Sequence, residues 1–303
     1  MSVKSVQAII SGQTYNLTLN SSTGKYEATV TAPSTSSYKQ SGHYYNVQVK
    51  ATDNAGNVTS KDASDSTIGA SLRLVVKEKV APVITITAPA ANSLIINNKP
   101  AITWTVTDND SGVNPDSIKL IIDTGTAIAG DSITKTAVTG GYSCSYTPAT
   151  ALVDGSHIIK VDASDYDGNA AEQKTGSFKI DTVPPTLSIT APADNLVTNQ
   201  TKVSVIGTTN DATSSPVTLT IKLNSGAAEN VQVAGNGTFS KELTLSNGSN
   251  TITVTATDGA GKTTTVTRTV TVDTVPPVIS AVSLSPNPVD SGKTFVISVT
   301  VSD

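Results

Sequence analysis

Hydrophobic and polar residues alternate along most of this chain with a period of two. Ile102, Trp104 and Val106 are separated by threonines, and segments 219–223 and 252–254 show the same alternation. Runs of this kind are typical of strands with one buried face, whereas a helix repeats its apolar positions every three or four residues. Glycine, asparagine, aspartate and proline separate the runs at the short intervals that favour a β-sandwich. The pattern therefore predicts an all-β protein.

Two short motifs repeat along the chain. The junction Asp-Thr-Val-Pro-Pro occupies 181–185 and 273–277, and a weaker copy, Lys-Val-Ala-Pro, occupies 79–82. A turn that begins Ala-Thr-Asp or Ala-Ser-Asp occurs in three related versions, at 51–57, 163–169 and 256–262. Repetition of this kind indicates a tandem array of similar domains.

These junctions and turns resemble those of the tandem bacterial immunoglobulin-like (Big-type) domains of surface adhesins and phage tail proteins. The resemblance covers essentially the whole chain and implies tandem immunoglobulin-like β-sandwiches in an extended rod. Because proline fixes its own φ and restricts the preceding residue, the linkers are expected to be short and stiff. Such domains serve as spacers, adhesins and assembly modules, so the resemblance alone does not decide the function.

The repeats enclose two complete domains, which we expect at 82–181 and 184–273. The start of the chain differs, because residues 6–12 align with 118–123, the third strand of the first complete repeat. Residues 1–79 are therefore expected to form an incomplete immunoglobulin-like domain that lacks its first two strands.

The last segment, 276–303, supplies strands of the kind that the first domain lacks. It predicts two strands, 278–284 and 295–301, joined around the turn at 286–288. A two-stranded hairpin alone is marginal in water. We therefore expect one sandwich to be split between the N- and C-terminal ends, with 276–303 completing the N-terminal domain of a neighbouring subunit.

Two sets of apolar residues would form the core of this shared sandwich. The self-assembly donor set is Val278, Ile279, Val282, Leu284, Phe295, Ile297, Val299 and Val301. The acceptor set is Val6, Ala8, Ile10, Leu17, Leu19, Tyr26, Ala28, Val30, Val47 and Val49. Burial of each large apolar side chain contributes about 1.5–3 kcal/mol, and the addition of strands to an open sheet is a known mode of recognition.

A head-to-tail contact that does not close on itself generates an open filament. The sequence therefore predicts a structural subunit of an extracellular, spore-surface or virion filament, with the chain as its own partner. Two alternatives stay open: truncation of a longer protein, and a phage-tail or cell-surface adhesin or spacer module that binds host glycans or proteins. Tyr38, Tyr44 and Tyr45 would be the patch that stacks on sugars.

Composition and charge narrow the function further. The net charge of −4 provides no basic patch, which argues against nucleic acid as a partner, and no apolar run reaches the length of a membrane span. The N-terminus lacks the pattern of a signal peptide, so we expect another route of exposure or a signal removed beforehand.

Cys144 is the one cysteine, so no intrachain disulfide is expected. With only His43 and His157 and no nucleophile motif, we expect no enzyme activity and no cofactor.

Calcium is the one ion for which the sequence offers candidate ligands. Four aspartates are expected in two loops at the same end of the middle domain, namely Asp108, Asp110, Asp165 and Asp167. Calcium takes six to eight oxygen ligands, which carboxylates supply. Aspartate, asparagine and glycine are also ordinary turn residues, and the next domain offers only Asn210, Asp211 and Asp258 at the equivalent positions. Both interpretations stay open.

Overall fold

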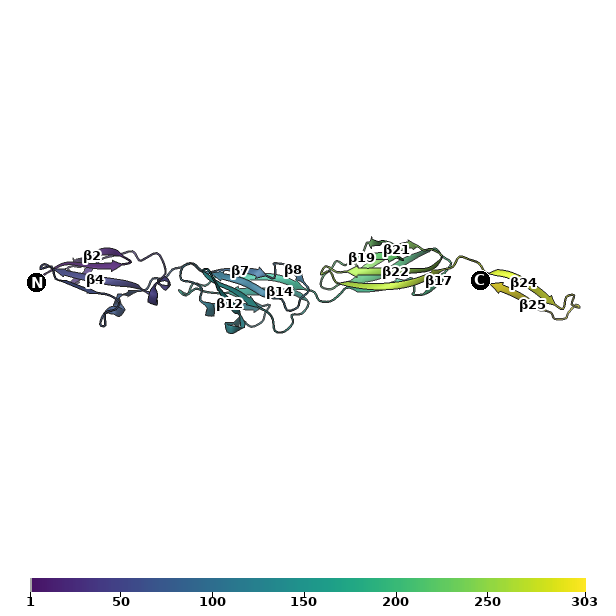
Figure 1. Ribbon diagram of the computed structural model, residues 1–303, viewed down its shortest axis with the longest axis horizontal. Coiled ribbons are helices and arrows are strands. Elements are labelled where there is room, and N and C mark those ends of the chain that lie inside the picture. Colours follow the sequence, from purple (N-terminus) through teal and green to yellow (C-terminus); the bar gives the residue numbers. More distant parts are fainter. Residues whose placement is uncertain (1) are drawn as a thin grey trace. The chain divides into compact units, whose positions relative to one another are not determined.

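The computed structural model describes residues 2–303, and nearly all of their regular structure is β (Figure 1). The helical turns are short 3-10 segments, η1 (Ser37–Lys39), η2 (Ser41–His43), η3 (Gly69–Leu72), η4 (Pro115–Ser117) and η5 (Gly130–Ser132). The chain divides into two compact units, one ending at Ile180 and the other beginning at Asp181. The all-β prediction is confirmed.

The middle domain is a complete sandwich of two sheets. Its strands are β7 (Val83–Ala88), β8 (Ser93–Ile95), β9 (Ile102–Thr107), β10 (Lys119–Ile122), β11 (Ile128–Ala129), β12 (Thr134–Val138), β13 (Gly141–Tyr146), β14 (Gly155–Asp162) and β15 (Lys174–Ile180). One sheet has the order β12-β13-β9-β7 and the other β11-β10-β14-β15-β8, in which β8 runs parallel to β15. Ile102, Trp104 and Val106 are fully buried. The alternation seen in the sequence thus turns one face of β9 into the core.

The third domain, which opens the second unit, repeats this architecture. Its strands are β16 (Thr186–Ala191), β17 (Leu196–Thr198), β18 (Lys202–Asn210), β19 (Thr218–Leu223), β20 (Ala228–Val231), β21 (Thr238–Thr244), β22 (Gly248–Thr257) and β23 (Thr263–Val272). The sheets have the orders β16-β18-β21 and β17-β23-β22-β19-β20, and β17 is parallel to β23. Val205, Ile252 and Val254 are fully buried between the two sheets.

The N-terminal domain has one sheet where the other domains have two. Its strands are β1 (Val3–Ile10), β2 (Gln13–Asn20), β3 (Lys25–Glu27), β4 (Tyr45–Asp53), β5 (Val58–Lys61) and β6 (Arg73–Leu74). They are paired in the order β3-β2-β1-β4-β5, with β6 also paired to β4. Among residues 2–78, the buried apolar side chains are Ile10, Tyr45, Ala63 and Leu72. One face of this sheet therefore has no second layer over it.

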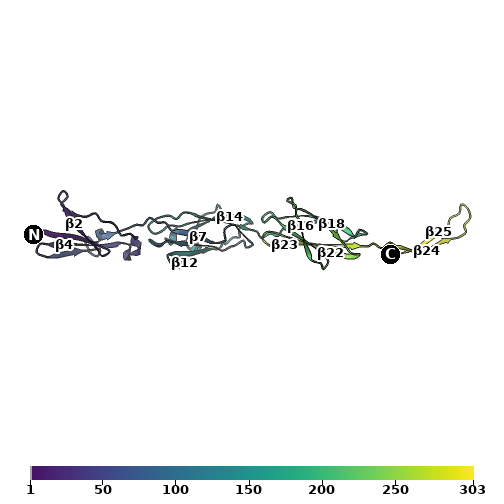
Figure 2. The same ribbon diagram turned by 90° about the horizontal axis from the view of Figure 1, so that it is seen from above.

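The last two strands, β24 (Val278–Ser285) and β25 (Val296–Ser302), pair only with each other. Both views show them side by side as a separate two-stranded ribbon (Figures 1 and 2). Every residue of both strands is exposed. This hairpin therefore has no hydrophobic core of its own in the isolated chain.

The thiol of Cys144 should be inert in the folded protein. Cys144, on β13, lies opposite Trp104 of β9 and is 1% exposed. Burial raises the pKa of its thiol to about 11. We expect a disulfide reagent at pH 8 to label Cys144 at least about 100-fold more slowly in the native chain than in denaturant. A Val153→Cys variant, at a position that is 74% exposed, is the control that should label at once. Complete labelling of native wild-type protein at the rate of this control would contradict the burial.

Candidate functional site

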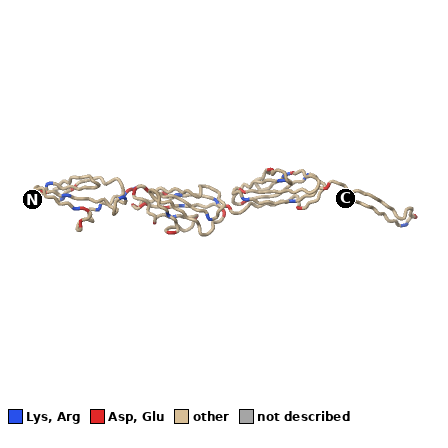
Figure 3. The backbone as a smooth tube through the Cα atoms, viewed as in Figure 1, with Lys and Arg blue, Asp and Glu red and all other residues tan. Residues whose placement is uncertain are grey.

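The hairpin has one strongly apolar face, which we call the donor face. Strand pairing places six apolar side chains on it: Ile279, Val282, Leu284, Ile297, Val299 and Val301. Directly opposed residues of an antiparallel pair project to the same face. Their exposed fractions run from 44% for Leu284 to 65% for Ile279, and the two strands carry no charged residue, the nearest charges lying at the hairpin turn and the chain end (Figure 3).

Two of the predicted donor residues lie elsewhere. Val278 is opposite Ser302 and belongs to the other face of the hairpin. Its counterpart in the complete middle domain, Val83, also lies outside the core and is 62% exposed. Phe295 precedes β25 and is 45% exposed. The donor face is therefore narrower than the set expected from the sequence.

Eight of the ten predicted acceptor residues share one face of the N-terminal sheet, which we call the acceptor face, whereas Ala28 and Val30 follow β3 and belong to no strand. Pairing aligns Val6 with Leu17, Ala8 with Val49 and Ile10 with Val47, while Leu19 is opposite Tyr26. Ile10 is buried, Leu19 is 56% exposed, Val30 is 38% exposed, and most of the others are half-buried. In the complete domains the counterparts of Val49, which are Val161 and Val254, are fully buried. Val161 and Val254 are more buried than Val49 because a second sheet covers them in the complete domains.

Strand register makes the N-terminal sheet equivalent to one sheet of each complete domain. Ile10 pairs with Val47 as Ile122 pairs with Ile159 and Leu223 with Ile252. Each first strand is followed by a residue with positive φ: Ser11, Asp123 and Asn224. The partner strand then runs, over the same spacing in sequence, to an aspartate: Asp53, Asp165 and Asp258.

The hairpin is equivalent to the first antiparallel pair of each complete domain, which is β7 with β9 and β16 with β18. Val278 is opposite Ser302, Val83 is opposite Thr107 and Thr186 is opposite Asn210, with the same separation in sequence each time. All three pairs contain a register shift in their first strand. The donor residues Val299 and Val301 therefore correspond to Trp104 and Val106, which are fully buried in the middle domain.

One strand of the N-terminal domain lacks the partner that its counterparts have. In the complete domains, a glycine with positive φ, Gly140 or Gly237, precedes a strand that pairs with β9 or β18. Gly24 also has positive φ, yet β3 after it is short and pairs with β2. Residues 28–30 beyond it have no strand partner.

A groove of about 680 Å³ lies at the Ile10 end of the acceptor face. Ile10, Tyr15 and Tyr45 line it together with the segment 31–35. In the middle domain this end is filled by β9, whose Ile102 is fully buried. Ile297 of the hairpin holds the position equivalent to Ile102.

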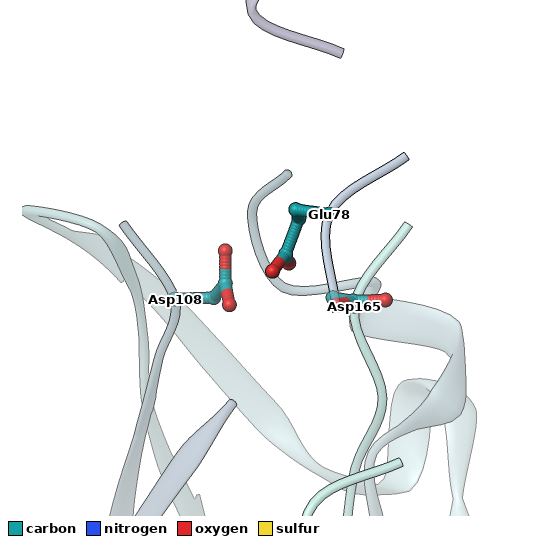
Figure 4. Close-up of side chains that lie close together, drawn as sticks. All are labelled: Glu78, Asp108 and Asp165. Atoms are coloured by element: carbon teal, nitrogen blue, oxygen red, sulfur yellow. The ribbon is translucent and has the colours of Figure 1, made fainter. Parts of the chain in front are cut away.

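A second feature is a carboxylate cluster at the start of the middle domain. Glu78, Asp108 and Asp165 each have a carboxylate oxygen within 4.8 Å of the other two, and their carboxylates face a common space (Figure 4). Asp108 accepts hydrogen bonds from the N–H groups of Asp110 and Gly112, at 2.9 and 2.8 Å. Glu78 comes from the linker and was not among the four predicted ligands.

The other two predicted calcium ligands face different partners. Asp110 accepts a hydrogen bond from the N–H of Ser36 at 2.9 Å, and Asp167 accepts one from the N–H of Glu78 at 3.0 Å. Both carboxylates therefore join the middle domain to the segments before it. Of the four predicted calcium ligands, Asp108 and Asp165 belong to the carboxylate cluster with Glu78.

The environment shifts the pKa values of two of the clustered acids in opposite directions. Burial raises the pKa of Glu78, and its hydrogen bond with Asp165 adds to the rise. Burial acts in the same direction on Asp165, but hydrogen bonds from the side chain and backbone of Asn169 outweigh it and lower the pKa. The contact between the two carboxyl groups therefore raises the pKa of Glu78 and lowers the pKa of Asp165.

The third domain contains an equivalent cluster, in which Asp211 and Asp258 hold positions that the sequence indicated and Asp181 is an addition from the linker. Asp181, Asp211 and Asp258 are all buried, and each has an oxygen within 4.8 Å of the others. Asp181 is the first residue of the Asp-Thr-Val-Pro-Pro motif, and Glu78 stands at the same distance before Pro82. The acidic residue four positions before Pro82 and before Pro185 is the sequence signal for this third ligand position.

The three tyrosines considered for sugar stacking do not form one open platform. Tyr38 stacks on Tyr166 with ring centroids 5.0 Å apart and also contacts His43. Arg73 lies over the ring of Tyr44. Tyr45 is 6% exposed and its hydroxyl bonds to Thr35. Their rings are thus already engaged within the chain.

The fold defines the class: this is a chain of tandem immunoglobulin-like β-sandwich domains. Residues 82–161 match the family described as bacterial Ig domain, which confirms the resemblance noted in the sequence. Residues 185–274 match the family described as glucodextranase, domain B. Within residues 2–303, no helix has the length and apolar character needed to cross a membrane.

Individual relatives are distant. A chitinase, ChiA of Flavobacterium johnsoniae, is 28% identical over 206 residues, which are 64% of this chain and 13% of the chitinase. Fibronectin(III)-like modules of Clostridium thermocellum CbhA are 19% identical, with a TM-score of 0.35, over 63% of this chain and 94% of theirs. The titin I-band fragment I67–I69 is 12% identical, with a TM-score of 0.47, over 89% of this chain and 88% of its own.

The raised pKa of Glu78 predicts that this carboxylate destabilises the fold at neutral pH. A folded state that binds a proton more tightly than the unfolded chain loses stability as the pH rises above the ordinary value of 4.5. In chelator at pH 7–8, Glu78→Gln should therefore raise the Tm of the middle domain, and the gain should vanish below about pH 4. Glu172→Gln, which removes an exposed carboxylate from the same domain, should leave the Tm unchanged. A Glu78→Gln variant that melts at or below the wild-type temperature at pH 8 would contradict the assignment.

Proposed function

We propose that this protein is a non-catalytic, extracellular structural chain whose copies join head to tail. In this proposal, the hairpin β24–β25 of one copy covers the acceptor face of the next copy and completes its N-terminal sandwich. The observation that carries the proposal is that two bare apolar faces have the strand registers of the two halves of a complete domain. Contiguous exposed apolar faces are a feature of protein interaction sites.

The loops of the two halves support the same conclusion. Asp53 accepts a hydrogen bond from the N–H of Asn57 at 2.8 Å, as Asp165 does from Asn169 at 2.7 Å. Asp273, before the hairpin, accepts one from the N–H of Val275 at 3.0 Å. The segments that would meet in the shared sandwich are thus already folded as in a complete domain.

The complete domains also suggest how the hairpin would be aligned. In the middle domain, Cys144 is opposite Trp104, and the equivalent pair in the shared sandwich is Ala28 with Val299. In the third domain, Lys241 is opposite Val205, and the equivalent pair is Ala28 with Ile297. Either register buries the donor face and gives residues 28–30 a strand partner, which removes an open sheet edge.

The energetic argument is that both faces lose contact with water together. Each large apolar side chain buried contributes about 1.5–3 kcal/mol, and the donor face has six of them. Association costs roughly 4–15 kcal/mol in lost freedom of motion. The two contributions are of the same order, so the proposal requires burial on both partners together with main-chain hydrogen bonds along the added strand.

A charge placed on the donor face should abolish assembly. We expect the wild-type chain to form multimers in size-exclusion chromatography with light scattering, and Val299→Asp to yield the 30.9 kDa monomer, because an unpaired carboxylate cannot be buried in an apolar core without a large cost. Thr300→Asp, on the opposite face of the same strand, is the matched control and should still assemble. Equal behaviour of the two variants would contradict the proposal.

A second function is favoured by the chitinase match, which places related sequence within a carbohydrate-active enzyme. In that case the chain would be an accessory spacer of a larger secreted protein, and residues outside 1–303 would cover both bare faces. The two proposals differ in one result. A wild-type chain that stays monomeric at every concentration supports the spacer and contradicts head-to-tail assembly.

A further inference from the structure

The strongest unexplained feature is the cluster of three buried aspartates in the third domain. Asp181 is 0% exposed, Asp258 is 6% exposed and Asp211 is 8% exposed. They come from three segments: the linker before β16, the loop after β18 and the loop after β22. Within the described residues, no ion pair joins any of them to a lysine, arginine or histidine. Three acids are thus gathered without a basic partner.

Each aspartate uses one oxygen to hold its own loop. Asp181 Oδ1 accepts the N–H of Val183 at 3.2 Å, and Asp258 Oδ1 accepts that of Lys262 at 2.8 Å. Asp211 Oδ1 accepts the N–H of Ser214 at 2.6 Å. These bonds fix the orientation of all three carboxylates.

The remaining oxygens are what point to a ligand. Asp181 Oδ2 and Asp258 Oδ2 are buried and accept no hydrogen bond. Buried polar atoms in native proteins are nearly always satisfied, and an exception calls for an unseen partner such as an ion. Because both atoms belong to carboxylates beside a third carboxylate, the missing partner carries positive charge.

We propose that Asp181, Asp211 and Asp258 bind one calcium ion. All the donors are hard carboxylate oxygens, and calcium accepts six to eight oxygen ligands in flexible geometry, so that loop carbonyls and water can complete its shell. Magnesium requires a near-ideal octahedron at shorter distances and retains several waters. The ion would fasten the segment 181–185 to two loops of the third domain.

The middle domain shows what the same position looks like when its oxygens are satisfied. There Glu78 stands in the place of Asp181, and Ser111 and the N–H of Val80 donate hydrogen bonds to its carboxylate. The cluster therefore recurs at two successive junctions, but the unpaired buried oxygens of the cluster belong to the third domain. We therefore assign the calcium ion to Asp181, Asp211 and Asp258.

The test is calcium binding to the full chain after treatment with a chelator. Calcium chloride at 5 mM should raise the Tm of the third domain by about 5 °C or more and slow amide exchange in 181–185, 209–216 and 257–263. Asp258→Asn should abolish both effects and raise the Tm of the calcium-free protein by relieving repulsion. Glu229→Gln removes an exposed carboxylate from the same domain and should leave both effects intact.

Two results would overturn the assignment. One is a calcium titration that changes neither the melting of the third domain nor exchange in its three loops. The other is an Asp258→Asn variant that retains the full wild-type response, which would move calcium to another site. Magnesium chloride at the same concentration should give a smaller shift, and an equal or larger one would contradict the choice of calcium.

Discussion

The structure depends on one constraint: a β-sheet with an apolar face must be covered by a second layer. The middle and third domains satisfy it internally, with Trp104 and Val254 fully buried between their sheets. The N-terminal sheet and the terminal hairpin do not, and each exposes the side chains that its counterparts bury. Because the hydrophobic effect scales with the apolar area removed from water, these two faces dominate how the chain can associate.

Much of this could be predicted from the sequence because the signals are local. Period-two alternation located β9, and the hairpin strands were expected at 278–284 and 295–301 against Val278–Ser285 and Val296–Ser302 in the structure. Strand register then follows from repeated landmarks. The position of Val278 was harder, because a register shift between Ile279 and Ala281 changes which residues share a face.

The carboxylate clusters could be predicted only in part, because they combine loops with linkers. Asp108 and Asp165 were expected together, since both follow strands at one end of the domain. Asp110 could not be assigned from its own loop, because its partner Ser36 belongs to the preceding domain. Asp181 lies in a proline-rich junction whose sequence indicates stiffness, and only the folded chain brings it to Asp258.

The central claim is that the donor face of one copy covers the acceptor face of another, and site-directed cross-linking between two separately purified variants tests it most directly. Ala28→Cys chains mixed with Val299→Cys or Ile297→Cys chains should form a covalent dimer under mild oxidation with one of these two partners. Thr18→Cys, which follows Leu17 on β2 and therefore lies on the opposite face of the sheet, should react far less, and the buried Cys144 should stay free. Failure of Ala28→Cys to cross-link with either partner, or equal reaction of Thr18→Cys, would contradict the shared sandwich.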